Sequence, residues 1–318
     1  MTEEQMTPPT EIERSVILPT PGEVITSVAT GISYVMGDRL GEGHFGVVFG
    51  CSDGWNNDLA AKVLKATGSY ESVRAAAEAE LRKLLLLRHP HITYVYDAFE
   101  YRDTFYIVTE RCYCPLQQFF GTEWFHGRLW VAPVARCVLQ AINYLHINQY
   151  AHQDIHLGNV FAAFSRDEMQ PTVPGPIQFK VGDLGVSKLF SEIDAANTLN
   201  NAIRPPEAIK PAEFGPLDSR IDLYHAGLLF LQLARSEILN FTQDEILNGR
   251  PRELALELDP PLNVALEKAL RRHVMYRSAN AMELWRDLQS PPALPGAGNV
   301  DESVQPNKAL EPTERVDE

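Results

Sequence analysis

An octet in the middle of the chain, His-Gln-Asp-Ile-His-Leu-Gly-Asn at positions 152–159, constrains this sequence more than any other stretch. It places Asp154 and Asn159 five positions apart in a short segment behind a His. The Asp carboxylate can orient a hydroxyl group and accept its proton, and the Asn amide oxygen can ligate a divalent cation. These two groups are needed to move a phosphoryl group from a nucleotide to an alcohol. The octet therefore predicts a phosphoryl-transfer site.

The charge and the apolar pattern of the chain exclude several classes of function. The formal net charge is −14 and the pI is about 5.1, which argues against nucleic acid as the main partner. The N-terminus shows no signal peptide, and the longest apolar stretch, residues 226–234, is about half as long as a membrane span. The four cysteines show no paired Cys-x-x-Cys spacing. They indicate reduced thiols in a cytoplasmic protein. From the short apolar stretch we expect no membrane partner.

Hydrophobic periodicity divides the chain into a strand-rich first third and a helical remainder. The acidic, proline-rich residues 1–30 are expected to form a flexible arm, and the acidic residues 289–318 a disordered tail. Between them, strands are predicted at 35–40, 46–51, 59–64, 92–99, 104–109, 160–164 and 178–182, and helices at 70–87, 221–234, 261–271 and 279–288. The helix at 221–234 is apolar almost all round, so we expect it to be buried.

A glycine-rich loop and a lysine in an apolar strand point to a nucleotide. Residues 40–48 contain Gly-x-Gly-x-x-Gly-x-Val, and strand-like residues follow the last glycine instead of the helix that a Rossmann loop requires. A loop between two strands can fold over nucleotide phosphates, because glycines let backbone amides approach them closely. Lys62 would ordinarily be an edge-strand lysine facing solvent. Glu80 follows on a predicted helix at the distance expected of its ion-pair partner, which favours a phosphate-binding role for Lys62.

With these elements in order, the chain resembles a eukaryotic-type protein kinase of the Ser/Thr type over about residues 34–288. The resemblance adds Asp183-Leu184-Gly185 as the metal-binding triplet, Glu207 at the end of the activation segment and Arg277 as its ion-pair partner. It implies an α+β, bilobal fold within residues 31–288. The N-lobe, residues 31–111, would be a five-stranded antiparallel sheet with one helix, and the C-lobe, residues 112–288, would be mainly helical.

The resemblance also implies the cofactors and the roles of individual residues. ATP and Mg²⁺ would be the cofactors, and a protein the substrate. Asp154, Lys62 and Glu80 would be catalytic, and Asn159 and Asp183 would hold the metal. The nucleotide would contact the glycine-rich loop, strand residues beside it and the hinge: Leu40, Gly41, Glu42, Gly43, His44, Phe45, Gly46, Val47, Val48, Ala60, Lys62, Thr109, Glu110, Cys112 and Phe161.

Two residues of the octet depart from the family pattern. Gln153 stands where many relatives carry the Arg that binds a phosphate on the activation loop, and a neutral amide cannot form that charge-assisted pair. We therefore expect activity that does not need phosphorylation of this loop. His156 replaces a Lys that contacts the γ-phosphate, and Asn200 and Ile203 replace a Thr and a Tyr near the substrate.

These departures leave two alternatives open. The sequence Asp-x-His-x-Gly-Asn also resembles the loop of small-molecule phosphotransferases of the aminoglycoside-kinase type, whose acceptor is a small alcohol. The other alternative is a pseudokinase scaffold that binds ATP without turnover. The complete glycine loop, the Glu207 and Arg277 positions, and the presence of Lys62, Asp154 and Asp183 favour a protein kinase.

Overall fold

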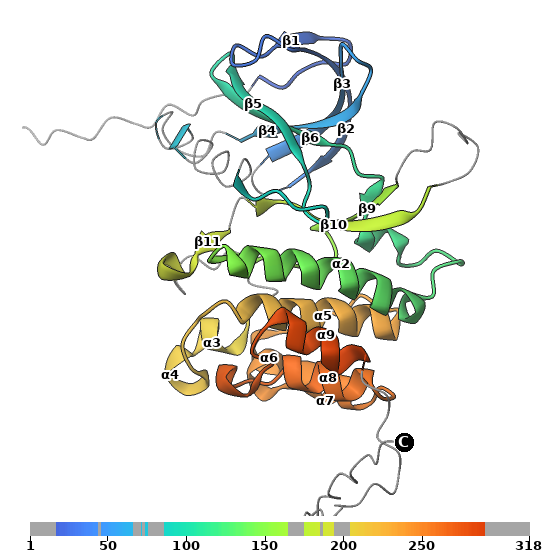
Figure 1. The fold of residues 1–318 in the computed structure, drawn as a ribbon, viewed down its shortest axis with the longest axis vertical. Coiled ribbons are helices and arrows are strands. Elements are labelled where there is room, and N and C mark those ends of the chain that lie inside the picture. Colours follow the sequence, from blue (N-terminus) through green and yellow to red (C-terminus); the bar gives the residue numbers. More distant parts are fainter. Residues whose placement is uncertain are drawn as a thin grey trace, which may run out of the picture.

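A six-stranded antiparallel sheet and a stack of helices form the two lobes of the molecule (Figure 1). The structure is a computed structural model. It describes residues 17–43, 46–65, 71, 74–75, 86–164, 175–184, 187–193 and 204–289. In this part of the chain, no helix is long and apolar enough to cross a membrane.

The sheet of the smaller lobe has the strand order β1-β2-β3-β4-β6-β5, with every neighbouring pair antiparallel. Side chains alternate between its faces, as in any strand. In β4, Ala61 and Val63 are buried in the core of the sheet, whereas Ala60 and Lys62 lie on the opposite face and line a cavity. The strands are β1 Val24–Thr26, β2 Ser33–Glu42, β3 Gly46–Asp53, β4 Asp58–Leu64, β5 Val95–Tyr101 and β6 Thr104–Glu110.

The sheet has six strands where the sequence predicted five, because part of the predicted flexible arm belongs to the fold. Strand β1 pairs with β2, with Val24 opposite Val35. The hydroxyl groups of Thr30 and Tyr34 both donate hydrogen bonds to the buried carboxylate of Asp97, at 2.7 and 3.0 Å. A three-residue strand has little periodicity of its own. It pairs with β2, and the segment that joins the two strands contacts Asp97, 67 positions from Thr30, which the local sequence does not reveal.

The predicted helix at 70–87 lies largely outside the described residues. The positions in this range that the structure assigns to a helix are 71, 74, 75 and 86. Glu80 lies outside the described residues, and so do residues 1–16, which begin the predicted arm, and the predicted tail from residue 290 onward. The predictions for these residues stay predictions.

The larger lobe is built around two long helices, α2 (Gly127–Ile147) and α5 (Ile221–Arg235), which pack against each other. The apolar face of α2, with Val134, Val138, Ile142 and Leu145, is fully buried. Helix α5 is buried almost all round, as predicted. The other helices are η1 Leu116–Phe119, η3 Phe190–Glu192, α3 Pro206–Ile209, α4 Pro211–Phe214, α6 Gln243–Asn248, α7 Arg250–Leu256, α8 Leu262–Ala269, η6 Val274–Tyr276 and α9 Ala281–Gln289.

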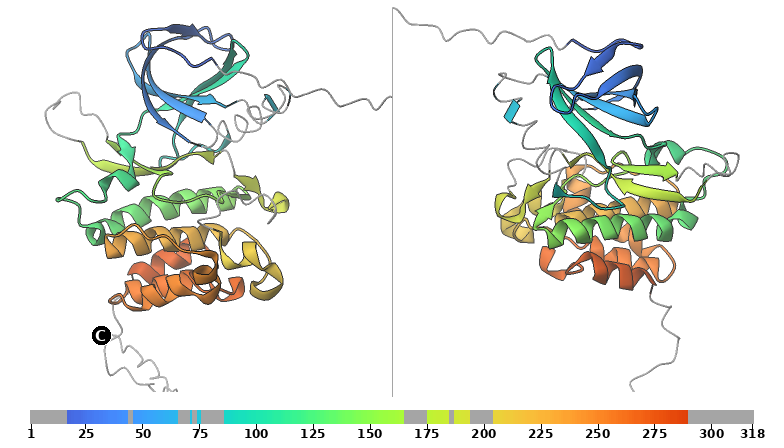
Figure 2. Two further views of the ribbon diagram at one scale, coloured as in Figure 1. Left: turned by 180° about the vertical axis from the view of Figure 1, so that it is seen from behind. Right: turned by 45° about the horizontal axis from the view of Figure 1, so that its top comes forward.

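Short strand pairs lie between the large sheet and helix α2, as the views in Figure 2 show for β9 and β10. Strands β9 (Val160–Phe164) and β10 (Ile177–Val181) form the antiparallel pair that the sequence predicted, and β7 (Cys114–Pro115) adds to β9. Strand β8 (Tyr150–Ala151) pairs with β11 (Lys188–Leu189). The octet lies between β8 and β9, and the Asp183 triplet lies between β10 and β11. The pairing of β9 with β10 and of β8 with β11 therefore fixes the relative positions of the two motifs.

Candidate active site

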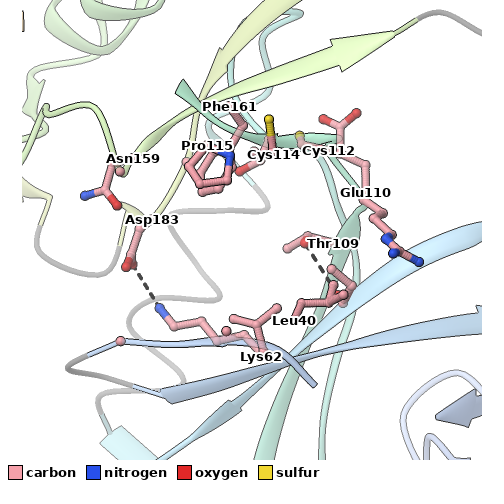
Figure 3. Close-up of a pocket in the computed structure, with 18 of the residues that line it drawn as sticks. Leu40, Lys62, Thr109, Glu110, Cys112, Cys114, Pro115, Asn159, Phe161 and Asp183 are labelled. Carbon is pink, nitrogen blue, oxygen red and sulfur yellow. Dashed lines mark hydrogen bonds and ion pairs between the residues drawn. The ribbon is translucent and has the colours of Figure 1, made fainter. Parts of the chain in front are cut away.

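A cavity of about 570 Å³ lies where the two lobes meet (Figure 3). Residues from six strands (β2, β3, β4, β6, β7 and β9) and from the octet line it, so segments predicted separately from the sequence converge on one site. Of the predicted nucleotide contacts and metal ligands, the cavity brings together Leu40, Gly41, Glu42, Gly43, Gly46, Val48, Ala60, Lys62, Thr109, Glu110, Cys112, Phe161, Asn159 and Asp183.

Val47 is an exception among the predicted contacts. It does not line the cavity, and its side chain is buried in the core of the sheet. Successive side chains of a strand face opposite sides, so Val48 and Val47 cannot both face the nucleotide. His44 and Phe45 lie outside the described residues. Asp154 does not line the cavity either, and its position is described with the octet below.

The sequence missed part of the lining. Ile107 could have been found, because it lies two positions before Thr109 on a predicted strand and must share its face. Gly158 and Leu184 belong to the octet and to the Asp183 triplet, although neither was predicted as a contact; the rest reach the cavity because the chain folds back on itself. These additional lining residues are Thr93, Arg111, Tyr113, Cys114, Pro115, Gln118, Gly158, Gly182 and Leu184.

An ion pair joins the two lobes across the cavity. Lys62 Nζ on β4 lies 2.9 Å from Asp183 Oδ1, although 121 positions separate the two residues (Figure 3). The backbone at Asp183 is left-handed, with φ of 58°, and this turn lets the next side chain, Leu184, be fully buried. Gly182 is needed before it, because a Cβ at this position would lie 2.7 Å from the ring of Phe161. The backbone thus holds Asp183 toward Lys62.

A buried carboxylate supports the start of the octet. Asp222 on α5 accepts hydrogen bonds from the backbone N–H groups of His152 and Gln153, at 2.8 and 2.7 Å, and from His146 Nε2 at 2.8 Å. Burial would raise the pKa of Asp222, but the hydrogen bond with His146 and the nearby imidazoles outweigh it and hold the pKa below its usual range. The backbone at Gln153 is left-handed, with φ of 69°. Asp222 therefore fixes the conformation from which Asp154 follows.

The side chains of Asp154 and Asn159 lie close together, as the octet predicted. Asn159 Nδ2 donates hydrogen bonds to the backbone oxygen and to Oδ2 of Asp154, at 2.9 and 3.1 Å. The amide nitrogen is committed, which leaves the amide oxygen of Asn159 on the side of Asp183 (Figure 3). An amide oxygen and a carboxylate are hard ligands that suit Mg²⁺, an ion that proteins usually hold with one or two side chains and the phosphates of a substrate. The residues present therefore fit this metal.

His156 is held in one tautomer beside Asp154. Its Nδ1 accepts a hydrogen bond from the backbone N–H of Gly158 at 3.0 Å, so the neutral ring carries its proton on Nε2. Nε2 lies 3.6 Å from Asp154 Oδ2. Burial would raise the pKa of Asp154, but the neighbouring imidazoles of His156, His152 and His225 outweigh it and keep the pKa below its usual range. Asp154 is therefore an ionised carboxylate at neutral pH.

The hinge between the lobes is fixed by Glu110. Its carboxylate accepts two hydrogen bonds from Lys180 Nζ on β10, both at 2.8 Å, and one from the backbone N–H of Tyr94 at 2.7 Å. Cys112 and Cys114 follow as free thiols, and burial raises the pKa of Cys112 to about 12. In the described residues they belong to no group that could hold a metal.

The predicted pair of Glu207 and Arg277 is confirmed. Arg277 Nη1 and Nη2 donate to the two carboxylate oxygens of Glu207, each at 2.6 Å, and both side chains are fully buried. Arg277 also lies over the ring of Tyr224, at 4.5 Å from its centroid. Arg277 therefore connects Glu207, at the end of the activation segment, with Tyr224 on helix α5 of the larger lobe.

Comparison with known proteins agrees with this geometry. A family model described as "Protein kinase domain" matches residues 34–284. Cyclin-dependent kinase D-1 of Arabidopsis thaliana is 26% identical over 210 residues, which are 63% of this chain and 48% of that protein. RAF proto-oncogene serine/threonine-protein kinase of Xenopus laevis is 25% identical over 214 residues, 64% of this chain and 31% of that protein. The match thus spans about half or a third of these relatives.

A solved structure shows the same fold. The autoinhibited serine kinase domain of the giant muscle protein titin superposes with a TM-score of 0.62 at 20% identity, covering 81% of this chain and 80% of that one. The family model covers well over half of the chain, and Lys62, Asn159 and Asp183 line one cavity. The chain therefore belongs to the protein kinase domain family.

Proposed function

We propose that the chain is an ATP- and Mg²⁺-dependent protein kinase that transfers the γ-phosphate of ATP to a Ser or Thr hydroxyl group of a protein. The observation that carries the proposal is the cavity in which Lys62, Asp183 and Asn159 meet, with Asp154 hydrogen-bonded to Asn159. A pseudokinase usually lacks one of these groups. The RAF relative is named a serine/threonine-protein kinase, which supports a Ser/Thr acceptor.

Each of the four polar residues of the site would have a separate role in phosphoryl transfer. Lys62 would hold the phosphates of the nucleotide through its ammonium group. Asp183 and Asn159 would hold Mg²⁺, whose charge offsets that of the transferring phosphoryl group. Asp154, already ionised and fixed by Asn159, would accept a hydrogen bond from the acceptor hydroxyl and take its proton. Most of the rate enhancement would come from positioning and charge stabilisation.

A single labelling experiment tests this function against its alternatives. The purified chain is incubated with Mg²⁺ and γ-labelled ATP, together with a protein mixture and, separately, a panel of small alcohols that includes aminoglycosides. We expect label on Ser or Thr residues of protein and none with Asp183→Asn. Label on a small alcohol would instead establish a small-molecule phosphotransferase, and no transfer to any acceptor, with ATP still bound, would establish a pseudokinase.

We infer further that this activity does not require phosphorylation of the activation loop. Gln153 is almost completely buried, and its backbone N–H donates a hydrogen bond to the buried carboxylate of Asp222. Beyond the triplet, β11 begins the activation segment and pairs with β8 before the octet. These contacts support a catalytic loop that is ordered without a phosphorylated residue.

Thr198→Ala tests this inference. We expect the rate of phosphoryl transfer to change little, because position 153 carries a glutamine, which cannot form a charge-assisted pair with a phosphorylated Thr198. The variant and the phosphatase-treated wild type are compared by initial rate, with melting temperature as a control for folding. Ser187→Ala and Ser191→Ala are measured in the same way, since the loop also offers these hydroxyl groups. Loss of most of the activity in a folded variant would overturn the inference.

A further inference from the structure

A second pocket, of about 290 Å³, lies in the larger lobe and shares no lining residue with the active-site cavity. Its lining comes from helix α7, from the segment after α8 and from η6. Three of the lining residues are arginines, the other two are aromatic residues that can form hydrogen bonds, and none is acidic: Arg252, Arg271, Arg272, His273 and Tyr276. We call this group of five residues the arginine pocket.

The arginine pocket has more positive than negative charge. In the described residues, Arg252 and Arg271 share one carboxylate, that of Glu267, and Arg272 pairs with none. Glu267 accepts from Arg252 Nε at 2.6 Å and from Arg271 Nε and Nη2 at 3.1 and 2.9 Å. The formal surplus is therefore two positive charges, in a chain whose net charge is −14. A local surplus of this sign in an acidic protein selects for an anion.

The guanidinium groups are held in place by contacts that use only part of their donors. Arg271 donates through Nη1 to the backbone oxygen of Tyr276 at 3.1 Å in addition to its two bonds with Glu267, so it is fully anchored. Arg272 donates through Nη1 to the backbone oxygen of Leu247 at 3.0 Å and lies over the ring of Phe214.

Several donors remain for a ligand. A guanidinium group has five N–H donors. Among the described residues, both Nη atoms of Arg252, and Nε and Nη2 of Arg272, have no hydrogen-bond partner. Anchored guanidinium groups with free N–H donors suit the oxygens of a phosphate, because the donors match its geometry and lose little entropy on binding.

The chemistry of the ligand follows from charge and size. A phosphoryl group on a side chain carries about −1.5 to −2 charges at neutral pH, close to the surplus in the pocket, whereas a carboxylate carries one. Five residues enclose the pocket, which suits a single side chain better than a nucleic-acid strand. The acidic remainder of the chain disfavours an anionic membrane surface as well. We propose that the arginine pocket binds a phosphorylated side chain in a peptide segment of a substrate or partner protein.

Fluorescence polarisation with defined peptide pools tests the proposal without ATP. One labelled pool has a central phosphoserine between degenerate positions, and matched pools have Ser or Glu at the centre. We expect the phosphoserine pool to bind roughly tenfold more tightly than either matched pool, since charge-assisted hydrogen bonds to a doubly charged group are lost in both. The double variant Arg252→Gln/Arg272→Gln should lose this preference, while its melting temperature stays near that of the wild type.

Arg250→Gln is the matched control, because Arg250 lies on the same helix, is half exposed, pairs with Glu253 and does not line the pocket. It should bind like the wild type. Asp183→Asn should also bind like the wild type, so a failure of the proposed kinase activity would leave this result unaffected. Equal binding of the three pools, or an undiminished preference in the double variant, would overturn the proposal. So would inorganic phosphate, or vesicles containing phosphatidylserine, binding more tightly than the phosphoserine pool with the same dependence on Arg252 and Arg272.

Discussion

Asp154→Asn is expected to lower kcat for phosphoryl transfer by roughly 10²–10⁴-fold, the usual contribution of a positioned acid or base. The affinity for Mg²⁺ and ATP should stay close to that of the wild type, because Asp154 does not line the nucleotide cavity. The substituted amide keeps an oxygen that can accept from Asn159 Nδ2, and the second bond of Asn159, to the backbone oxygen of residue 154, does not depend on the side chain. The change therefore removes the proton acceptor and leaves the metal ligand in place.

Asp183→Asn is the matched control, since it makes the same substitution at a carboxylate that does line the cavity. This variant should lose both turnover and the dependence of ATP binding on Mg²⁺, because a neutral amide is a weaker ligand and cannot form the ion pair with Lys62. Nucleotide binding is measured by titration with and without Mg²⁺, and rates by label transfer to protein. A rate for Asp154→Asn near that of the wild type, or an equal loss of rate and affinity, would contradict the role assigned to Asp154.

The parts of the active site that the sequence predicted are those with a fixed local geometry. The glycine loop, Lys62 and Thr109 lie on or between strands whose alternation decides which side chains face the cavity. The five strands predicted for the smaller lobe are present, although β5 begins at Val95 and not at the predicted residue 92. The octet places Asp154 beside Asn159 through hydrogen bonds within one short segment. Val47 shows how motif membership can mislead, because the motif includes the residue but the strand turns its side chain into the core.

The remaining parts depend on contacts between distant segments. The salt bridge between Glu110 and Lys180 spans 70 positions, and no pattern near either residue indicates the other. Strand β1 was predicted as part of a flexible arm, because neither its pairing with β2 nor the hydrogen bond of the following Thr30 to Asp97 is apparent from the residues of the arm. The arginine pocket could not be predicted from the sequence either. Arg252 and Arg271 are brought together by the carboxylate of Glu267, with which both pair in the folded chain. Local propensity carries no record of such pairings.

Arg277→Met should destabilise the folded chain by about 3–5 kcal/mol, the cost of leaving one member of a buried ion pair without its partner. Glu207 is fully buried, and the substitution removes both of its hydrogen bonds with Arg277. The backbone oxygens of Arg271 and Arg272 also lose donors, because Arg277 Nε and Nη2 contact them at 2.7 and 3.2 Å. The free energy of unfolding is measured by urea titration, with the unfolding slope compared between variants.

Two further variants separate the buried charge from the lost side chain. Arg250→Met removes an arginine from the exposed pair with Glu253 and should cost less than about 1 kcal/mol, because water replaces the partner. Adding Glu207→Leu to Arg277→Met should recover much of the lost stability, since an apolar pair of similar size leaves no charge to desolvate. A double variant as unstable as Arg277→Met alone would show that the carbonyl contacts and the packing on Tyr224, not the charge of Glu207, account for the loss. Arg277 would then stabilise the fold chiefly through its contacts with residues 271 and 272 of the arginine pocket and with Tyr224, and less through neutralising Glu207.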